Sequence, residues 1–375
     1  LIIIIMINDN TDIRNIKFLG KNTEFKITKE WLFNLKKISK TKIDQDAFKL
    51  IISDINNNKL EFQITQQESN YIKTCEDENL LDYLLYRYKF KEYPKKKIST
   101  DFPLYILVEP VSSCNLKCNV CFQSDKSFIK KEFMGKMDFQ LYKKVIDEAV
   151  ENGTKAITFG SRGEPTIHPE ITEFIDYAKN KFLDFKLITN ATKLSEKLIN
   201  KIFDSNIDLV QFSIDSEDKI IYEKIRKFAK FDEVLKNVQR YCEIKKNYKN
   251  CKTVTRVSGL KVYEEQSDEN FHKFWGQYAD EVVFKKVSER WNTYNNEVNE
   301  DLLTPCRAIW ERMYVWFDGK VNPCDADYKS YLSYGNVKND TIKNIWNSDA
   351  FFNLKKTHLD NKRNKLTPCD RCGQH

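Results

Sequence analysis

The chain has 375 residues, of which 41% are hydrophobic, 13% aromatic and 31% charged, so it is neither intrinsically disordered nor collagen-like. Its length exceeds the roughly 250–300 residues at which one core usually stops growing, which predicts a globular protein of two or three domains. The net charge of +7 comes from 62 basic and 55 acidic residues spread along the chain, and it does not require a nucleic-acid partner.

Residues 1–100 mix short apolar segments with helical patterns, and we assign them to an N-terminal α+β accessory region. The predicted elements are strands at 15–18 and 24–27, a helix at 31–38, a hairpin of 48–52 and 60–64, and a helix at 79–90. A polar segment interrupted by proline, 91–100, is predicted to be a linker. The apolar run at 1–6 is far shorter than the ~20 residues that span a bilayer, and no basic residue precedes it as a secretion signal requires. We expect a cytoplasmic chain without a membrane partner.

From residue 101 the pattern changes to strands that alternate with amphipathic helices, which is typical of a parallel sheet with crossover helices. The predicted strands are 104–109, 155–160, 185–189, 209–213, 253–259 and 281–284, and the predicted helices include 139–150, 170–181 and 231–244. These βα units are too few for a closed eight-stranded barrel. We predict an α/β fold in which 101–299 form a partial (βα)6 TIM-like barrel, with its functional end at the carboxyl ends of the strands.

The ten cysteines fall into groups, and clustered thiols in a reducing compartment are more often metal ligands than disulfides. Cys114, Cys118 and Cys121 form a C-x3-C-x2-C motif directly after the first predicted strand. Three thiolates can surround one soft metal centre, and on a four-iron cluster they leave one iron open for an exchangeable ligand. A structural zinc site completed by a distant His or Cys is the alternative.

Small polar residues follow the next three predicted strands. Gly163 and Glu164 follow the second strand, Asn190 the third, and Ser213 and Asp215 the fourth. Singly, such residues are most often helix caps. Because the carboxyl ends of parallel barrel strands meet at one mouth, their order along the chain predicts a shared site.

With these motifs, residues 102–290 resemble the radical SAM superfamily, whose partial barrel carries a C-x3-C-x2-C loop after its first strand. The resemblance implies that Cys114, Cys118 and Cys121 are catalytic ligands of a four-iron, four-sulfur cluster. The open iron of that cluster would bind the amino and carboxylate groups of S-adenosylmethionine (SAM).

The resemblance also implies roles in SAM binding for residues around the loop. Phe122 would contact the adenine side, Gly163 and Glu164 the methionine amino group, and Ser213 and Asp215 the ribose, with Asn190 also at the cofactor. Arg226 would pair with the methionine carboxylate, or else form a surface pair with Glu223. Arg162 departs from the family's glycine and is interpreted either as a cation for an anionic substrate or as an outward-pointing side chain. Gly259 would let adenine approach, or is a simple strand-end glycine.

The tail, 300–375, has little periodicity, so we expect it to depend on a metal for its fold. Its cysteines Cys306, Cys324, Cys369 and Cys372 resemble a SPASM domain, a small C-terminal iron-sulfur domain. The resemblance implies one auxiliary four-iron, four-sulfur cluster that is fully ligated and suited to electron transfer, with a four-cysteine zinc site as the alternative. The leftover Cys75, Cys242 and Cys251 are interpreted as small buried hydrophobes, although recruitment of one of them is left open.

The implied activity is that of a radical SAM oxidoreductase, which cleaves SAM reductively to a 5′-deoxyadenosyl radical that removes hydrogen from a substrate. A flavodoxin- or ferredoxin-type reductant is the implied partner. We expect a small polar or sugar substrate, to which Arg290, Trp291, Asn292 and Tyr294 offer polar and aromatic contacts unless they only connect domains. The alternatives are modification of peptide or protein side chains, as by a maturase of ribosomally made peptides, and a non-catalytic, zinc-stabilised protein that binds nucleic acid.

Overall fold

The computed structural model describes residues 2–5, 25–28, 77–287 and 291–373. Strand β1 (Ile2–Ile5) pairs antiparallel with β2 (Phe25–Thr28), which covers most of the strand predicted at 24–27. The other elements predicted before residue 77, and Cys75, lie outside the described residues. No helix in the described ranges is long and apolar enough to cross a membrane.

Helix α4 (Asp77–Lys96) contains the helix predicted at 79–90 and extends beyond it. The linker prediction for 91–100 is therefore wrong over its first six residues, because Pro94 lies within the last helical turns. Lys97, the first residue after the helix, has a left-handed φ of 58°. The N–H groups of Lys97 and Ile98 donate to the carbonyls of Pro94 and Tyr93, which is the Schellman pattern that closes a helix.

Six parallel strands form the barrel sheet, and all six overlap the predicted strands. They are β3 (Tyr105–Val108), β5 (Ala156–Phe159), β6 (Asp184–Thr189), β7 (Leu209–Ser213), β9 (Val254–Lys261) and β10 (Glu281–Lys286). The strand order is β10-β9-β7-β6-β5-β3, so β10 and β3 do not pair and the barrel stays open. The predicted partial barrel is confirmed.

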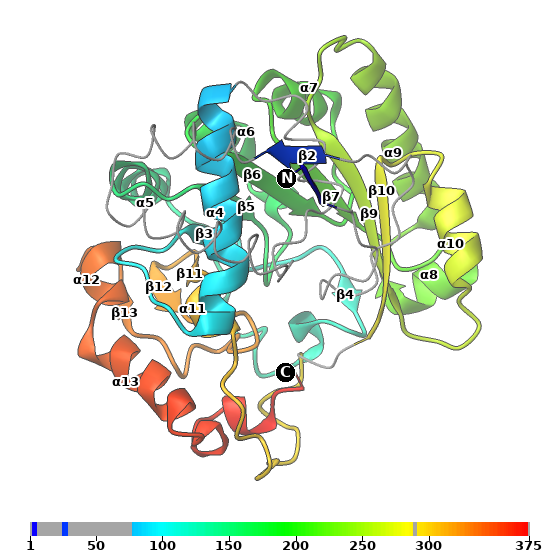
Figure 1. Cartoon of the computed structure of the whole chain (residues 1–375). Helices are drawn as coiled ribbons and strands as arrows, with labels where there is room; N and C mark the ends of the chain where they lie inside the picture. The colour runs from blue at the N-terminus through cyan, green and yellow to red at the C-terminus, as the bar shows by residue number, and fades with distance from the viewer. Residues whose placement is uncertain (1, 6–24, 29–76, 288–290, 374–375) are drawn as a thin grey trace.

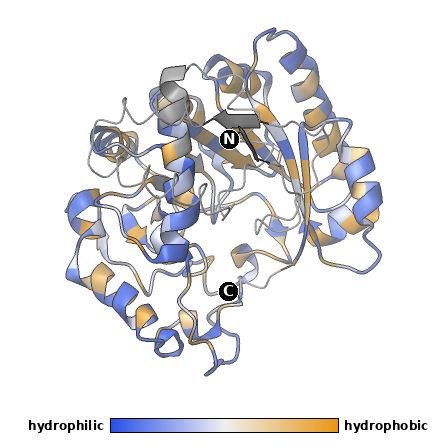
Figure 2. Ribbon diagram, in the orientation of Figure 1, coloured by the Kyte–Doolittle hydropathy of each residue, from blue (hydrophilic) through white to orange (hydrophobic). Residues whose placement is uncertain are grey.

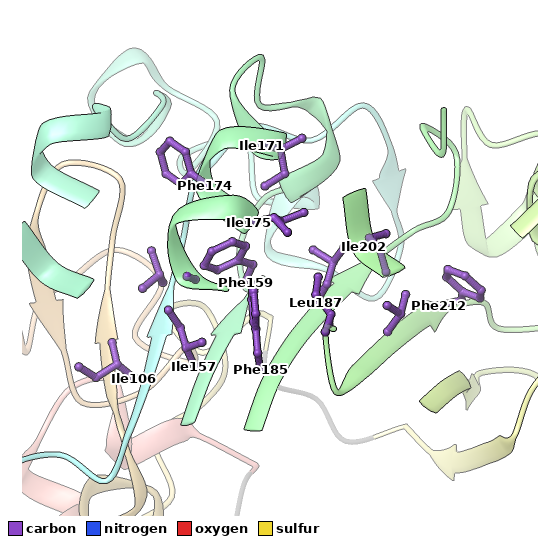
Figure 3. Packing of buried hydrophobic residues seen from close by; sticks show 14 of the residues in the cluster. Ile106, Ile157, Phe159, Ile171, Phe174, Ile175, Phe185, Leu187, Ile202 and Phe212 are labelled. Atoms are coloured by element: carbon purple, nitrogen blue, oxygen red, sulfur yellow. The ribbon is translucent and has the colours of Figure 1, made fainter. Parts of the chain in front are cut away.

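Helices cover the outer face of this sheet (Figure 1). They are α5 (Phe139–Glu151), α6 (Ile171–Ala178), α7 (Glu196–Asp204), α8 (Lys219–Ile225), α9 (Phe231–Lys246) and α10 (Asp268–Trp275). Figure 2 shows apolar strands in the centre and helices that are hydrophilic on one side. Between strands and helices lies an aromatic core that includes Phe159, Phe174 and Phe185 (Figure 3). Within it, the rings of Tyr142 and Phe174 stack with their centres 4.1 Å apart.

The tail extends the barrel sheet. It contains α11 (Ala308–Glu311), β11 (Met313–Val315), β12 (Lys320–Asn322), β13 (Gly335–Asn336), α12 (Ile342–Trp346) and α13 (Asp349–Leu359). Strand β11 pairs parallel with β3, and β12 and β13 continue the sheet antiparallel. Its apolar side chains join the barrel's main buried cluster. The tail therefore has a regular sheet connection that its short apolar segments did not predict.

The remaining elements are short and most of them lie in loops around the sheet. They are β4 (Lys117–Cys118), β8 (Arg226–Lys227), η1 (Phe122–Ser124), η2 (Lys131–Phe133), η3 (Pro165–Ile167), η4 (Arg363–Lys365) and η5 (Cys369–Arg371). Of these, β4, β8, η1 and η3 bring the site residues together, as described next.

Candidate active site

A cavity of about 520 Å³ lies at the carboxyl ends of the parallel strands. Ten predicted site residues, drawn from five segments of the chain, line it together. They are Cys114, Cys118, Cys121, Phe122, Gly163, Glu164, Asn190, Ser213, Asp215 and Arg226. The structure therefore places all the residues predicted for the first cluster and for SAM around one opening.

The cysteine loop is fixed by a short antiparallel ladder. In it, β4 pairs with β8 so that Cys118 lies opposite Arg226, and the next N–H, from Asn119, donates to the carbonyl of Ile225 at 3.0 Å. Two donors also reach the sulfur atoms. Asn190 Nδ2 lies 3.8 Å from Cys114 Sγ, and an Arg226 nitrogen lies 4.0 Å from Cys118 Sγ. Donors of this kind stabilise thiolates, which are the form that binds iron.

The chemistry of these thiols fits a metal cluster. Burial raises the pKa of Cys114 and that of Cys118 to about 12, so the bare thiols keep their protons at neutral pH. A bound metal centre would supply the positive charge that displaces those protons. Within the described ranges, no three Cys, His, Asp or Glu side chains are placed to hold a single metal ion.

The turn after β5 holds Glu164 against the cavity. At Gly163, an added Cβ would lie 2.1 Å from the carbonyl oxygen of Val111, so only glycine fits there. Glu164 Oε1 accepts hydrogen bonds from the hydroxyls of Thr166 and Thr189, both at 2.7 Å, and Oε2 accepts one from the Asn190 N–H at 2.7 Å. Burial raises the pKa of the Glu164 carboxyl, and these donors oppose that shift. The carboxylate is therefore held in one orientation.

Ser161, in the same turn, was missed in the sequence and marks an incomplete site. It is not a glycine, yet its φ is 97°, in the left-handed region where strain is expected. Its hydroxyl is buried against the cavity without a hydrogen-bond partner in the described part of the chain. An orphaned buried hydroxyl beside three thiols indicates that a ligand completes this cavity.

Arg226 pairs with Asp215 across the cavity, with Nε 2.8 Å from Oδ2. The other oxygen, Oδ1, accepts the Leu260 N–H at 3.0 Å. The alternative surface pair with Glu223 is wrong, because Glu223 instead accepts the Phe231 N–H at 3.1 Å. Arg226 therefore stays at the site, between the carboxylate of Asp215 and the sulfur of Cys118.

The interpretation of Arg162 as an outward-pointing side chain is wrong, because the side chain is buried, and its charge is paired within the protein although the residue lines the cavity. Its Nε and a terminal nitrogen form a two-pronged ion pair with Glu109, at 2.6 and 2.5 Å. Another terminal nitrogen donates to the Tyr328 carbonyl at 2.8 Å, and the guanidinium stacks 4.1 Å from the Trp316 ring. Glu109 directly follows β3, whereas Tyr328 and Trp316 belong to the tail. Arg162 therefore joins barrel and tail.

Two other sequence interpretations are resolved by packing. An added Cβ at Gly259 would lie 2.6 Å from the Ile214 carbonyl oxygen and 2.7 Å from the Phe271 ring, so close packing explains this glycine without adenine. Trp291 lines the cavity, but the Tyr294 hydroxyl bonds to Asp327 in the tail. Tyr294 therefore connects the segment after β10 to the tail, whereas Trp291 lies at the cavity. Arg290 lies outside the described residues, and Asn292 bonds to Asn296.

Several further residues at the site were not identified from the sequence. Gln123 is buried and donates to the carbonyls of Ser112 and Arg162, at 2.7 and 2.8 Å, which ties the cysteine loop to the glycine turn. Additional residues lining the cavity are Gln211, Ser258, Lys285, Lys286 and Gly373. The alternation of inward-facing positions along β7 and β9 is a signal that predicts Gln211 and Ser258, because each lies two residues from another inward position.

The four tail cysteines form a second, separate group. Burial raises the pKa of Cys324 well above its usual value, and the neighbouring Cys369 and Cys372 raise it further. Burial raises the pKa of Cys369 as well, with Cys306 the next cause. These mutual effects show that the four thiols lie near one another. None of them lines the described cavity, although Gly373, next to Cys372, does. The tail site therefore lies beside the cavity without opening into it.

Basic side chains surround the tail cysteines. The N–H of Cys306 donates to Nδ1 of the buried His358 at 3.2 Å, and burial lowers the pKa of that histidine to about 4, with Arg363 and Lys97 as further causes. Arg363 is also buried. Away from this group, the Cys242 thiol donates to the Tyr278 carbonyl, and Cys251 packs against the core.

Comparisons with known proteins agree with this geometry. A family model described as the radical SAM superfamily matches residues 108–274, and one described as SPASM, an iron-sulfur cluster-binding domain, matches residues 306–373. The chain is 23% identical to the tungsten-containing aldehyde ferredoxin oxidoreductase cofactor-modifying protein of Pyrococcus furiosus, over 66% of this chain and 82% of that protein. It is 24% identical to the subtilosin biosynthesis protein AlbA of Bacillus subtilis, over 67% of this chain and 61% of AlbA.

Solved structures share the fold at lower identity. Streptococcus suis SuiB bound to S-adenosylmethionine aligns with a TM-score of 0.56 and 15% identity, over 90% of this chain and 88% of SuiB. BtrN in complex with AdoMet and 2-DOIA aligns with a TM-score of 0.50 and 20% identity, over 74% of this chain and 95% of BtrN. These alignments support the partial-barrel fold.

Proposed function

Because this chain belongs to the radical SAM superfamily and carries a C-terminal SPASM domain, we propose that it modifies a side chain of a peptide or protein substrate. When bound, the SAM-binding cluster supplies the electron that splits SAM into methionine and a 5′-deoxyadenosyl radical, which removes hydrogen from a substrate carbon. The sequence alone favoured a small polar or sugar substrate. The relatives support the peptide alternative better.

Two of these relatives bear on the substrate. AlbA, which matches 67% of this chain, is named for the biosynthesis of the antilisterial bacteriocin subtilosin. The mycofactocin maturase MftC of Mycobacterium tuberculosis is 27% identical over a shorter stretch, 37% of this chain and 34% of MftC. Their names describe biosynthesis and maturation, which is chemistry performed on a precursor.

The size of the cavity is the observation that carries the proposal. Pockets that enclose one drug-sized ligand have volumes of roughly 300–1,000 Å³, and SAM is such a ligand. A cavity of about 520 Å³ that must hold SAM leaves room for little more than one reacting group. The rest of the substrate would then lie outside, beyond the lining residues Lys285, Lys286 and Trp291. A peptide that inserts a single side chain fits this arrangement.

Different residues of this chain would contact different groups of one SAM molecule. Glu164, whose orientation is fixed by Thr189 and Asn190, would accept hydrogen bonds from the methionine ammonium group. Arg226 would pair with the methionine carboxylate while it remains bonded to Asp215. Since Asp215 is already engaged, Ser213 would be the main ribose contact.

The tail site would make the reaction an oxidation. Four thiolates satisfy every iron of a cubane, so a cluster held by Cys306, Cys324, Cys369 and Cys372 would be closed to substrate and suited to accept an electron. Gly373, next to Cys372, lines the cavity, which supports a position for that site beside it. The proposed units are the accessory region at 1–100, the barrel at 101–299 and the auxiliary-cluster domain at 300–375.

Co-expression with the short peptides encoded beside its own gene tests the proposal. We expect 5′-deoxyadenosine formation to rise with one such peptide, and mass spectrometry to find that this peptide has lost two hydrogens. A parallel assay would use aminocyclitols and nucleotide sugars. Stimulation by one of these compounds, with every peptide unchanged, would contradict the peptide proposal.

A further inference from the structure

Phe228 is an exposed aromatic residue in a strained turn. The turn runs from Arg226 to Ala229 and is closed by a hydrogen bond from the Ala229 N–H to the Arg226 carbonyl at 2.9 Å. Phe228 occupies its third position with a φ of 73°, where glycine is usual, and its side chain is 78% exposed. Left-handed backbone is unfavourable for a bulky residue, and an exposed ring adds little to folding. The combination indicates a role outside the fold.

The turn is joined to the cysteine loop by the β4–β8 ladder. It continues β8, whose Arg226 is paired opposite Cys118 of β4, so Phe228 is two residues from a position beside a cluster ligand. Adjacent strands lie ~5 Å apart and each residue advances ~3.3 Å. Phe228 therefore presents its ring to solvent on a short path to the first cluster. Ile220, on the neighbouring helix α8, is also exposed.

The surroundings of the turn are basic. Lys117 and Lys227 are cross-strand partners in the β4–β8 ladder. Lys117 bonds to the neutral Gln123, the ammonium of Lys224 lies 3.8 Å from the Tyr263 ring centre, and Lys227 is exposed. The nearby carboxylates are engaged elsewhere. Asp218 caps α8, Glu223 bonds to the start of α9, and Asp232 pairs with Lys219.

We propose that Phe228 and the lysines around it, Lys117, Lys224 and Lys227, form the docking surface for an acidic, flavodoxin-type electron carrier. The cations attract an acidic partner, and the ring can stack against the edge of a flavin. The carrier is oxidised by one electron and the SAM-binding cluster is reduced by one, with no bond made or broken. Electron-transfer encounters use small, transient interfaces, which suits a patch of four residues. The inference rests on radical SAM chemistry and not on the identity of the substrate.

Binding and electron transfer by reconstituted variants test the surface. With purified flavodoxin as the probe, we expect Phe228→Ala to raise Kd about tenfold, as loss of a central aromatic anchor does. Lys227→Glu should slow association and flatten its dependence on salt. Reduction of the cluster by reduced flavodoxin, followed by loss of its visible absorption, should slow in parallel. Phe352→Ala and Lys356→Glu on α13 are matched controls, because both residues are exposed and lie far from Phe228 in the sequence.

Two measurements separate docking from folding and from chemistry. Phe228→Gly removes the ring but suits the left-handed turn, so it should unfold at the same or a higher temperature while still binding flavodoxin weakly. Dithionite should drive 5′-deoxyadenosine formation equally in the wild type and in Phe228→Ala. If dithionite drives no 5′-deoxyadenosine formation in the wild type, the assignment of radical SAM chemistry is wrong, and the failure does not come from the docking surface.

Unchanged flavodoxin affinity in both Phe228→Ala and Lys227→Glu would overturn the proposal. So would a loss of peptide binding or of self-association in Phe228→Ala with flavodoxin binding intact, because the surface would then serve a substrate or a second copy. If Phe228→Ala weakens the binding of a ferredoxin but not that of flavodoxin, the choice of a flavin carrier is wrong.

Discussion

The two cysteine groups of this protein differ in what surrounds them. Cys114, Cys118 and Cys121 line a cavity together with a carboxylate, an arginine and several small polar groups. Cys306 and the other tail cysteines are packed among buried basic side chains, and none of these four lines that cavity. The group with three thiols therefore lines the cavity, and the group with four does not.

This difference teaches how one chain separates two uses of iron and sulfur. Three thiolates leave an iron free, and a cavity makes that iron reachable for a ligand. Four thiolates leave no iron free, so a cluster held by them has no position for a substrate. Arg162, bonded to both Glu109 and Tyr328, holds the two regions together. Variants can change the three-cysteine site, the four-cysteine site or Arg162, which joins the two regions.

Removal of one thiol from the open site should have the largest effect. Cys118→Ala leaves two ligands for the first cluster, so we expect 5′-deoxyadenosine formation to be lost and iron to fall by about four atoms per chain. Anaerobic reconstitution followed by iron analysis and chromatography of the products measures both. Full SAM cleavage by this variant would contradict the assignment of the loop.

Removal of one thiol from the closed site should separate two activities. Cys324→Ala is expected to keep SAM cleavage largely intact and to abolish formation of an oxidised product, because the electron acceptor is lost. The assay compares 5′-deoxyadenosine with modified substrate in the same sample. Retained product formation would show that the tail does not accept the electron. Cys242→Ala is a control, since that thiol lies outside both groups.

Breaking the link between the regions should lower stability. Arg162→Met leaves Glu109 buried without its partner, which costs about 3–5 kcal/mol, or a fall of about 10 °C in the unfolding temperature. Adding Glu109→Leu should recover much of the loss, because no buried charge is then left alone. If Arg162→Met unfolds at the wild-type temperature, Arg162 does not hold barrel and tail together.

A smaller effect is expected at the carboxylate of the open site. Glu164→Gln replaces an oxygen with an amide nitrogen that faces the donors of Thr189 and Asn190, so SAM affinity should fall about tenfold with iron content unchanged. Calorimetric titration with SAM measures the change. Glu170→Gln, an exposed carboxylate six residues away, is the control. Equal affinity in both variants would remove Glu164 from the SAM site.

The smallest effect should come from Ser213→Ala. The hydroxyl would contribute one hydrogen bond to ribose, worth about 1 kcal/mol, so SAM affinity should fall about fivefold. The same titration applies, and the iron content should match the wild type. An unchanged affinity here, together with one at Glu164, would place SAM elsewhere.

Local patterns predicted most of the barrel and the members of the site. The strands alternate with amphipathic helices, and each cysteine or strand-end residue is identified by its immediate neighbours in sequence. The structure accordingly gathers Cys114, Glu164 and Ser213 at one opening. Such features depend on spacing along the chain, which the sequence displays directly.

The features that were missed depend on distant contacts. Arg162 turns inward because Glu109 and Tyr328 are there to receive it, and neither is near it in sequence. Strand β11 has three residues, too few for a periodic signal, and it forms because β3 offers an unpaired edge. Pro94 and the polar residues around it resembled a linker, although the turn at Lys97 closes a helix there.

The central claim is that one chain holds an open cluster and a closed one. The most direct test is to measure iron, sulfide and zinc per chain after anaerobic purification and reconstitution. Two four-iron clusters predict about eight irons and about eight sulfides with no zinc. Zinc without stable iron would contradict the account, and about four irons with one zinc would remove the redox role of the tail.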